Sequence, residues 1–522
     1  MDAEVIVVGA GPTGLMLACE LALAGVRTLI VERRGEPQLQ SRALTLHPRS
    51  VELLDQRGIA DRFLALGRTM PAWHFAGLET KLDFAVLDSR HGYALLLAQA
   101  RTEALLEERA RELGVEILRG HETVGVREGS DSFDGVEVDV RGAGASRTLR
   151  SRYVVGCDGA RSVVRRAAGI GFPGTDETLT GMLGDFAVVG ADSGALDAAR
   201  ASGILIVGLE GGLTRFVVIA PGRMRVPSTE PVSLEEFRTA LKDACGSDCG
   251  IGEPQWLSRF GNATRLADSY RAGRVMLAGD AAHIHFPAAG QGLNTGLQDA
   301  MNLGWKLAAE VRGWAPPGLL DSYHAERHPV GQAVTENTEI QTLLAELTLV
   351  PQYVRPAGAL RALVNDLLGM KQVNRRLADA ISAIGTAYPS QGDPLTGRRM
   401  PDVALAATVG AVGAEGEEGA SGAAEVEAAG RVYDLLHEGC FVLLGLDGGS
   451  GVREAERWAP RVRPVRVARH DAHPALEGVA EVLIRPDGHV AWATRSQDGP
   501  TRREERTRAL TAWAGSPAKS GR

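Results

Sequence analysis

Three glycines near the start of the chain, Gly9, Gly11 and Gly14, have a spacing that indicates chemistry. They follow the apolar run Val5–Val8, which predicts a strand, and precede an apolar stretch that predicts a helix ending near Gly25. In such a turn the first glycine permits a tight bend, the second lets backbone approach a pyrophosphate, and the third lets helix and strand pack closely. The pattern predicts a dinucleotide-binding unit with the anion at the helix N-terminus, and it does not choose between NAD and FAD.

A carboxylate completes this unit. The run Thr28–Val31 predicts a second strand, and Glu32 follows it at about the spacing expected of an acid that binds ribose hydroxyls. We include its neighbour Arg33 among the candidate cofactor-binding residues. Strand, turn, helix, second strand and carboxylate stand in the expected order, so chance glycines are the weaker interpretation.

A second group of polar residues follows another predicted strand, Arg274–Ala278. Gly279 and Asp280 come directly after it, and a helix with a clear apolar face begins at Gly290. The first turn of that helix, Gly290 to Asn294, offers unpaired N–H groups at the positive end of the helix dipole, which suits an anion. A reduced flavin is negative around N1 and O2, so this turn would stabilise it while Asp280 accepts ribityl hydroxyl hydrogens. The alternative interpretation is an Asp N-cap beside a glycine-rich turn.

The chain resembles a known family through three segments: Gly9–Gly14, Tyr153–Pro173 (YVVGCDGARSVVRRAAGIGFP) and Gly279–Asn294 (GDAAHIHFPAAGQGLN). In order and separation they are similar to the three fingerprints of the para-hydroxybenzoate-hydroxylase-like, or group A, FAD-dependent aromatic monooxygenases. Within that family, WLSRFGNATR, AGDAAHIH, QDAMNLGWKL and LLDSYHAERHPVG are most similar to hydroxylases of angucyclines and related aromatic polyketides. The resemblance spans nearly the whole chain.

The resemblance implies FAD contacts for particular residues. Glu32 would bind the adenosine ribose, and Arg42 and Gln99 would contact the pyrophosphate and ribityl region. Asp280 would bind the ribityl hydroxyls. The backbone N–H groups of Leu293 and Asn294 would face the flavin pyrimidine. The full set of candidate cofactor-binding residues is Gly9, Gly11, Gly14, Glu32, Arg33, Arg42, Gln99, Asp158, Gly159, Gly279, Asp280, Gly290, Gly292, Leu293 and Asn294. Alternatively, Arg42 is a solvated surface base and Gln99 a polar residue at a strand end.

The resemblance also assigns roles to Asp158, Gly159 and Pro287. Asp158 and Gly159 belong to the fingerprint that the family uses for FAD and, indirectly, for NADPH or NADH, although Asp158 is also a good turn former. Pro287 lies where the family places a backbone carbonyl beside the substrate, and it is our one catalytic candidate. His283 and His285 lie near the expected flavin and could move protons, but a structural hydrogen bond explains either one equally well. No metal site is expected.

Two alanines depart from the family pattern. Ala98 precedes Gln99 where proline is usual, and Ala289 stands in the flavin-facing loop where glycine is usual. Alanine takes positive φ less readily than glycine, so the loop at Ala289 could have a different shape. Substrate fit and flavin mobility, rather than FAD binding, would then change.

The length predicts two or three domains, and the order of elements predicts an α/β fold. We expect a Rossmann-like FAD-binding domain, residues 1–174 and 272–400 with a helical extension, and a β-sheet substrate domain, residues 175–271. Two strand-like runs, Ile204–Leu209 and Leu213–Ala220, predict a hairpin in the substrate domain. The aromatic segment Trp73–Leu97 could line the same cavity, although core packing explains its individual side chains better.

Residues 401–522 are expected to form a C-terminal domain, which the resemblance makes thioredoxin-like. An Ala-, Gly- and Glu-rich stretch near 409–430 predicts a flexible loop within it. Only one cysteine, Cys440, lies in this domain, which excludes dithiol redox chemistry and favours a role in packing or dimerisation.

The charge and cysteine content of the sequence exclude several classes of binding partner. The formal net charge is −8 with scattered arginines, which argues against nucleic acid and anionic membrane surfaces. The five cysteines have no disulfide or metal-ligand spacing, the start lacks a signal-peptide pattern, and no apolar stretch reaches spanning length. We therefore expect a cytoplasmic enzyme, either a monomer or a homodimer.

The resemblance implies a mechanism. NADPH or NADH would reduce FAD, O2 would form a flavin C4a-hydroperoxide, and its distal oxygen would hydroxylate an aromatic polyketide-type substrate inside a cavity that excludes water. A Baeyer–Villiger oxygenation of a polyketide ketone would use the same peroxide. A flavoprotein that only binds and sequesters an antibiotic-like ligand is the non-catalytic alternative. No WxWxIP segment is present, which disfavours halogenation.

Overall fold

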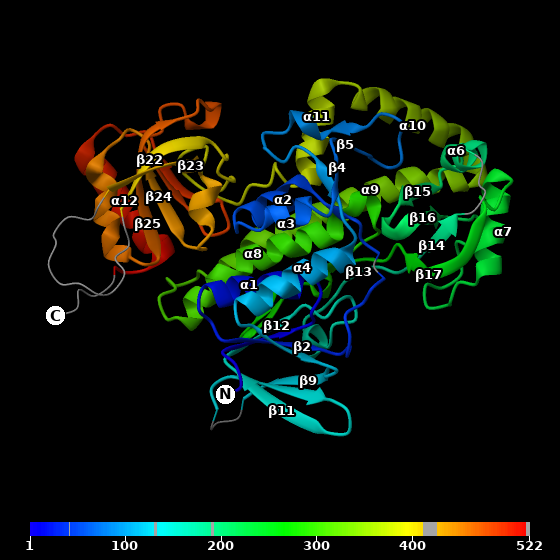
Figure 1. Ribbon diagram of the computed structural model, residues 1–522, viewed down its shortest axis with the longest axis horizontal. Coiled ribbons are helices and arrows are strands. Elements are labelled where there is room, and N and C mark those ends of the chain that lie inside the picture. The colour runs from blue at the N-terminus through cyan, green and yellow to red at the C-terminus, as the bar shows by residue number, and fades with distance from the viewer. Residues whose placement is uncertain (41, 130–132, 189–192, 411–424, 518–522) are drawn as a thin grey trace.

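The computed structural model describes residues 1–40, 42–129, 133–188, 193–410 and 425–517. Residues 411–424, the centre of the expected flexible loop, lie outside the described residues. The described part is a mixed α/β protein, with the FAD-binding motifs on one six-stranded sheet and two further large sheets (Figure 1). No helix of this part is long and apolar enough to cross a membrane.

The first sheet has the strand order β19-β20-β12-β1-β2-β8. Its strands are β1 (Val5–Val8), β2 (Thr28–Glu32), β8 (Glu116–Arg119), β12 (Tyr153–Gly156), β19 (Arg271–Ala272) and β20 (Val275–Leu277). β1 pairs in parallel with both β2 and β12, as a Rossmann-like unit requires. The predicted strands at Val5–Val8, Thr28–Val31 and Arg274–Ala278 are therefore confirmed, the last with slightly shorter bounds.

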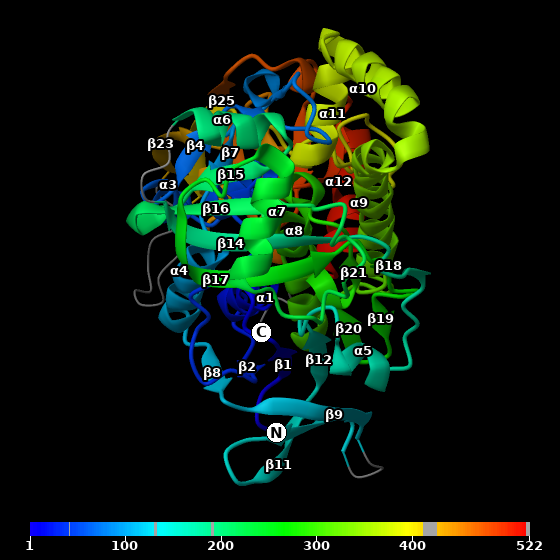
Figure 2. The same ribbon diagram turned by 90° about the vertical axis from the view of Figure 1, so that its right-hand side faces the viewer.

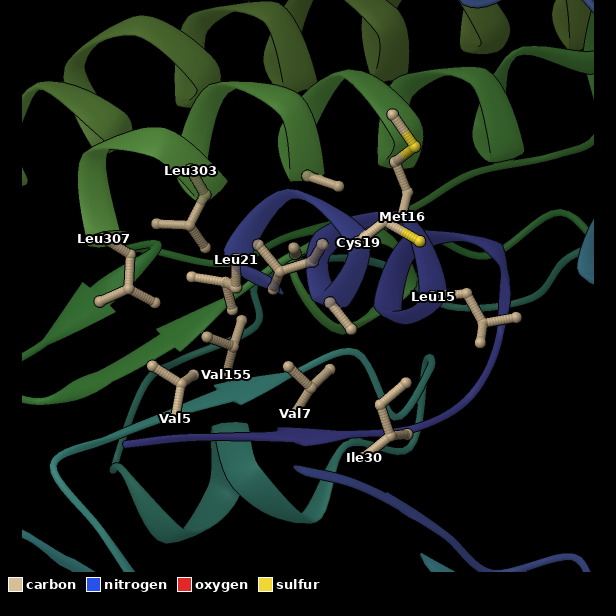
Figure 3. Packing of buried hydrophobic residues seen from close by; sticks show 14 of the residues in the cluster. Val5, Val7, Leu15, Met16, Cys19, Leu21, Ile30, Val155, Leu303 and Leu307 are labelled. Atoms are coloured by element: carbon tan, nitrogen blue, oxygen red, sulfur yellow. The ribbon is translucent and has the colours of Figure 1, made fainter. Parts of the chain in front are cut away.

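Two helices cover one face of this sheet. Apolar side chains of α1 (Pro12–Leu23) fill the space above Val5, Val7, Ile30 and Val155, and Leu303 and Leu307 of α8 (Gln291–Val311) close it (Figure 3). All of these side chains are almost completely buried, so the packing fixes the turn between β1 and α1 relative to the start of α8. A three-stranded meander, β9 (Glu122–Glu128), β10 (Val136–Arg141) and β11 (Ser146–Ser151), lies below the sheet in Figure 1.

The second sheet has the order β15-β16-β14-β17 and is entirely antiparallel. Its strands are β14 (Thr180–Val188), β15 (Leu205–Gly208), β16 (Leu213–Val218) and β17 (Ile251–Gly261), and α6 (Ser193–Ala201) and α7 (Leu234–Cys245) accompany it. The predicted hairpin is confirmed as β15–β16. Helix α7 lies across this sheet in Figure 2. Phe186, Phe216 and Phe237 form a buried aromatic cluster between the sheet and α7.

Three helices form the extension that follows α8: α9 (Ser322–Glu346), α10 (Val354–Leu368) and α11 (Lys371–Ser382). The segment Trp73–Leu97 packs against them, with Phe75, Leu82 and Phe84 almost completely buried. These aromatic and apolar side chains form a core cluster, which agrees with the packing interpretation of that segment.

Short elements connect these layers. The helices are α2 (Pro48–Asp55), α3 (Ala60–Leu64), α4 (Gln99–Glu112) and α5 (Val163–Ala167), and the strands are β3 (Thr45–Leu46), β4 (Arg68–Met70), β5 (Ala72–Trp73), β6 (Leu82–Asp83), β7 (Ala94–Leu96), β13 (Gly174–Thr175), β18 (Thr264–Leu266) and β21 (His283–Ile284). They carry the chain back and forth between the two sheets, so residues from both sheets meet at the site described below.

The C-terminal sheet has the order β23-β22-β25-β24-β26-β27, with one parallel pair, β24–β25. Its elements are β22 (Ala404–Gly410), β23 (Glu425–Arg431), β24 (Phe441–Gly445), β25 (Val462–His470), β26 (Glu481–Ile484), β27 (Val490–Thr494) and the helix α12 (Gly499–Ala514). The apolar runs Cys440–Leu446, Val479–Ile484 and His489–Ala493 supply β24, β26 and β27.

A buried network of charges joins this sheet to the FAD-binding part. Arg485, in the turn between β26 and β27, donates to both carboxylate oxygens of Glu326 at 2.8 Å and lies 2.5 Å from Asp487. Lys306 of α8 donates to Glu326 at 2.7 Å. The indole N–H of Trp305 points to Asp487 at 3.3 Å. Every charge in this network has an opposite partner, as burial of charges requires.

Candidate functional site

Two glycines in the turn between β1 and α1 differ in the space around them: a side chain has no room at Gly14 and open space at Gly11. A Cβ atom added to Gly14 would lie 2.0 Å from the carbonyl oxygen of Gly9, so only glycine allows the helix to approach the strand this closely. A Cβ added to Gly11 would meet nothing within 4 Å. Gly11 instead faces a large cleft, as expected of a residue whose backbone approaches a phosphate.

Glu32 at the end of β2 holds this turn in place. It is buried, and its two carboxylate oxygens accept the backbone N–H groups of Ala10 at 2.8 Å and Arg34 at 2.9 Å. Glu32 and Arg34 both line the cleft, whereas Arg33 is exposed and is not among the lining residues. Arg34, which was not among the predicted residues, follows the end of β2 and turns its backbone N–H back to Glu32.

The cleft has a volume of about 1690 Å³ and separates α4 from the hairpin β15–β16. Its lining includes Gly11, Glu32 and Arg34 at one end and Asp185, Val207 and Arg215 at the other. Arg101 of α4 and Glu210 of the hairpin form a salt bridge of 2.9 Å across it, with both side chains about half exposed. Ala98 and Ala100, the neighbours of Gln99 in the chain, line the cleft. The side-chain amide of Gln99 donates to the Glu103 carboxylate at 2.7 Å.

Asp280 and Arg42 lie close enough to affect one another's titration. Asp280 follows β20 and is exposed, and desolvation by the surrounding protein raises the pKa of its carboxyl while the charges of His283 and Arg42 oppose this. Desolvation lowers the pKa of Arg42, opposed by Asp280. Arg42 also donates to the Ser258 hydroxyl at 3.1 Å, so it connects the FAD-binding part to the second sheet.

The first turn of α8 is fixed by a side chain rather than by its glycines alone. The Asn294 side chain accepts the backbone N–H of His47 at 2.7 Å and donates to the carbonyls of Thr45 at 3.0 Å and Gly290 at 2.8 Å. Gly290 has the left-handed φ of 71°, which starts the helix, and Gly292 and Leu293 follow in the first turn. The predicted N–H cluster is therefore held rigidly against β3 and α2.

The loop before this helix contains an unusual alanine. Ala289 has φ 55° and ψ 13°, a left-handed conformation that costs a non-glycine residue about 1 kcal/mol. Its carbonyl oxygen accepts two ring N–H groups, from His47 Nε2 at 2.8 Å and Trp73 Nε1 at 3.0 Å. Two donors on one carbonyl offset this strain, so alanine takes the conformation that glycine would adopt. Ala98 has φ −57°, the value that proline would impose.

His47 is a neutral ring at neutral pH. It is completely buried, and burial lowers its pKa to about 4. Its Nδ1 has no hydrogen-bond partner among the described residues. Because Nε2 donates to Ala289, the proton of the neutral ring lies on Nε2. The sequence analysis missed both His47 and Trp73; the signal available was that a buried indole N–H needs an acceptor.

Replacing Trp73 with phenylalanine is expected to destabilise the protein by at least about 1 kcal/mol, because it removes one donor and leaves a smaller aromatic ring. The Ala289 loop would then depend on His47 alone, so we also expect weaker FAD binding. Urea unfolding of the apoprotein and titration with FAD would measure both effects. Trp492→Phe in the C-terminal sheet is the matched control, and equal changes in FAD affinity for both variants would contradict this role of Trp73.

The two loop histidines differ in environment. His283 Nε2 lies 2.7 Å from Asp299, which also accepts the Arg327 guanidinium at 2.8 Å and the backbone N–H of Gly279 at 3.1 Å. His283 thus belongs to a buried structural network. His285 Nδ1 lies 2.8 Å from the Phe286 carbonyl, and burial lowers the pKa of its ring to about 4. His285 is therefore a neutral ring at neutral pH.

Pro287 and Asp158 complete the predicted set. Pro287 is exposed at the start of the Ala289 loop, and its carbonyl is 3.5 Å from the Gly290 N–H. Asp158 accepts the Val163 N–H at 2.6 Å at the start of α5, while its other oxygen, Oδ1, is buried without a hydrogen-bond partner among the described residues. Gly159 has φ 80°, which suits a turn. Asp158 therefore caps a helix, with one oxygen left for a further donor.

These features fit a bound FAD. Gly11, whose missing side chain opens onto the cleft, the buried carboxylate of Glu32 that lines it, and the N-terminus of α8 that follows Asp280 in the chain suit the pyrophosphate, ribose and flavin ends of that molecule. Among the described residues no group of three or more His, Cys, Asp or Glu side chains could hold a metal ion.

Comparison with known proteins agrees with this arrangement. Residues 2–338 match the model of an FAD binding domain, and residues 420–517 match that of an aromatic-ring hydroxylase C-terminal domain. A rifampicin monooxygenase of Streptomyces venezuelae is 44% identical over 98% of each chain. A dialkyldecalin synthase of Streptomyces rugosporus is 40% identical over 96% of this chain and 97% of its own. The structure of an anhydrotetracycline hydroxylase from Streptomyces rimosus superposes with a TM-score of 0.84 at 40% identity, covering 99% of this chain and all of the other.

Proposed function

Because the chain belongs to the family of FAD-binding aromatic-ring hydroxylases, we propose that it hydroxylates an aromatic polyketide-type substrate with NADPH or NADH and O2. The family, the enzyme class and the use of FAD that the resemblance implied are confirmed, and NAD(P)H as co-substrate is typical of this class. The substrate class rests on relatives named for rifampicin and anhydrotetracycline. The observation that carries the proposal is the rigid first turn of α8 beside Asp280, with an Ala289 loop held by two donors.

The residues of this chain would hold FAD at four points. Gly11 would admit the pyrophosphate, Glu32 would accept ribose hydroxyls, and Asp280 would accept ribityl hydroxyls. The N–H groups of Leu293 and Asn294 would face the flavin pyrimidine. When bound, FAD would supply the redox chemistry, the transfer of two electrons from NAD(P)H to O2, with one oxygen atom inserted into the substrate and the other released as water. Pro287, at the start of the Ala289 loop, would present its carbonyl to the substrate.

We also propose the domain division given by the sequence, with residues 1–174 and 272–400 for FAD, 175–271 for substrate and 401–522 as a thioredoxin-like domain. Supporting this division, the first two sheets draw their strands from the first two sets of residues, apart from β19, which spans the boundary. A mixed sheet with the parallel pair β24–β25 supports the thioredoxin-like assignment.

One relative favours a second candidate. The dialkyldecalin synthase has nearly the same length and fold-defining motifs but a name that denotes no oxygenation. A flavoprotein of this family that binds a polyketide without oxidising it is therefore a specific alternative, in line with the binding-module interpretation. Baeyer–Villiger oxygenation of a ketone remains the alternative within redox catalysis.

The decisive experiment is an absorbance spectrum of the purified protein followed by NADPH oxidation with and without a panel of polyketide phenols and ketones. We expect flavin bands, oxidation that accelerates at least tenfold with one substrate, and a product one oxygen atom heavier. A phenol product supports hydroxylation and an ester product supports the Baeyer–Villiger reaction. Flavin bands with a transformed but unoxidised ligand would support the synthase alternative. No flavin band after addition of FAD would overturn the proposal.

A further inference from the structure

Two cysteines lie in contact at one end of the second sheet. Cys245 is the last residue of α7, and Cys249 lies in the loop that leads to β17. Their sulfur atoms are 3.9 Å apart, and both thiols are free. The spacing of the cysteines in the sequence did not predict this pair, because only the turn after α7 brings the two side chains together.

The backbone of that turn directs the second thiol towards the first. Gly246 ends α7 with a left-handed φ of 77°. The Ser247 hydroxyl accepts the backbone N–H of Cys249 at 3.0 Å. Cys249 itself has a φ of 54°, a left-handed conformation that residues with a side chain rarely adopt. The contact between the two sulfurs thus belongs to a fixed turn rather than to two freely moving side chains.

The two thiols differ in their access to solvent. Cys249 is completely buried in the same apolar cluster as Phe237, and its sulfur lies 3.8 Å from the Ala195 carbonyl oxygen of α6, the helix beside α7 in Figure 1. Cys245 is only half-buried, and its thiol donates to the Leu241 carbonyl at 3.2 Å. Burial also raises the pKa of the Cys249 thiol to about 12. Cys245 is therefore the thiol that a small oxidant in solution reaches first.

We propose that Cys245 and Cys249 are a modification site, at which hydrogen peroxide forms a disulfide that a dithiol reverses. The Cys245 sulfur attacks one peroxide oxygen, the O–O bond breaks, and a sulfenic acid and one water form. The Cys249 sulfur then displaces the hydroxyl of the sulfenic acid, and its proton leaves with that hydroxyl as a second water. Two electrons pass from the sulfurs to the peroxide.

Forming the bond requires only a small movement. The sulfur–sulfur bond is about 2.0 Å long, so the two sulfurs must approach by about 2 Å. Rotation about the Cα–Cβ bond of the half-buried Cys245 moves its sulfur by a distance of this order. The disulfide would tie the end of α7 to the loop before β17 and leave the rest of the sheet in place.

The pair gives an enzyme of this class protection from its own side product. Hydrogen peroxide forms when a reduced flavin passes electrons to O2 and no substrate takes up the oxygen. A sulfenic acid without a neighbouring thiol is oxidised further to sulfinic acid, which dithiols do not reduce. With Cys249 in contact, oxidation at Cys245 stops at the disulfide.

The test is the mass of the full chain with FAD after reduction, removal of the reductant and treatment with a few equivalents of hydrogen peroxide. We expect the loss of two hydrogen atoms and a peptide with a bond between Cys245 and Cys249. The free thiols counted in denaturant should fall from five to three, since two of the five cysteines are consumed. Dithiothreitol should restore all five.

Cys440→Ser is the matched control, because it removes another half-buried thiol, and it should lose the same two hydrogen atoms. A gain of oxygen atoms without this loss would overturn the proposal. A bond to a different cysteine, or a link between two chains, would overturn it as well.

Single substitutions test the order of the two steps. Cys249→Ser, treated with peroxide and dimedone, should carry one dimedone group on Cys245, the trapped sulfenic acid, and no disulfide. Cys245→Ser should label at Cys249 several-fold more slowly, because that thiol stays buried. Retained FAD binding shows that each variant is folded, and Cys245→Ser, at the half-buried position, gives the comparison if Cys249→Ser does not fold. Labelling of Cys249 in Cys245→Ser as fast as disulfide formation in the unchanged chain would contradict the assigned order.

Discussion

Replacing Gly11 with alanine is expected to weaken FAD binding about 100-fold, or roughly 3 kcal/mol, while the stability of the apoprotein stays unchanged. No protein atom lies within 4 Å of the added Cβ, so the folded chain tolerates it. The methyl group would stand in the cleft where backbone must approach the pyrophosphate. Titration of apoprotein with FAD, followed by the loss of flavin fluorescence, and urea unfolding without FAD would measure the two quantities separately.

Gly14→Ala provides the contrast for this prediction. Its Cβ would lie 2.0 Å from the Gly9 carbonyl oxygen, so helix and strand must move apart. We expect the apoprotein to lose about 1–3 kcal/mol of unfolding free energy, as overpacked cores do, and FAD binding to fall with it. If Gly11→Ala bound FAD as tightly as the unchanged chain, the pyrophosphate would not lie at this end of the cleft.

Replacing Glu326 with glutamine is expected to lower the unfolding free energy by about 3–5 kcal/mol, because it leaves buried cations without their carboxylate. Arg485 donates two hydrogen bonds to Glu326, and Lys306 donates a third. Burial lowers the pKa of Lys306 to about 7 even with this partner, which shows how little its charge is otherwise compensated. Urea unfolding at pH 6, where Lys306 is charged, with and without saturating FAD is the measurement.

Glu122→Gln is the matched control, since its salt bridge to Arg141 is more than 45% exposed on both sides and should contribute less than ~1 kcal/mol. The pH dependence adds a second readout. The pKa of Glu326 is lowered to about 2, mainly by Arg485 and Lys306 against the effect of burial. Its stabilising contribution is therefore fully present above about pH 4.5 and is lost as the pH falls towards 2. Glu326→Gln should lack this part of the acid dependence; equal acid profiles would contradict the role of the pair.

The parts of the fold that local physics determines could be predicted from the sequence. An apolar run, spaced glycines and an amphipathic stretch specify β1, the turn and α1 whatever surrounds them, and the same holds for β20 and α8. Arg33 stays a prediction, while Arg34, which lines the cleft, lies beyond the end of β2 in a turn whose course the sequence does not specify.

The remaining features depend on contacts between distant segments. His47 and Ala289 are 242 positions apart, and nothing local to either residue shows that one donates to the other. Alanine does resist a positive φ, as expected for Ala289. Two hydrogen-bond donors from elsewhere in the chain offset that cost. The pairing of Arg485 with Glu326, across 159 positions, was equally inaccessible, because isolated charges in a sequence are usually solvated.

Helix α8 has a practical consequence for recombining members of this family. Its 21 residues extend about 30 Å, with the first turn, after Asp280, at one end and Trp305 and Lys306 in its second half, beside the turn of the C-terminal hairpin. A chimera that took residues 401–522 from a relative would place a foreign hairpin against this helix and its partner Glu326. Such hybrids should fold only when both sides of that junction are exchanged together.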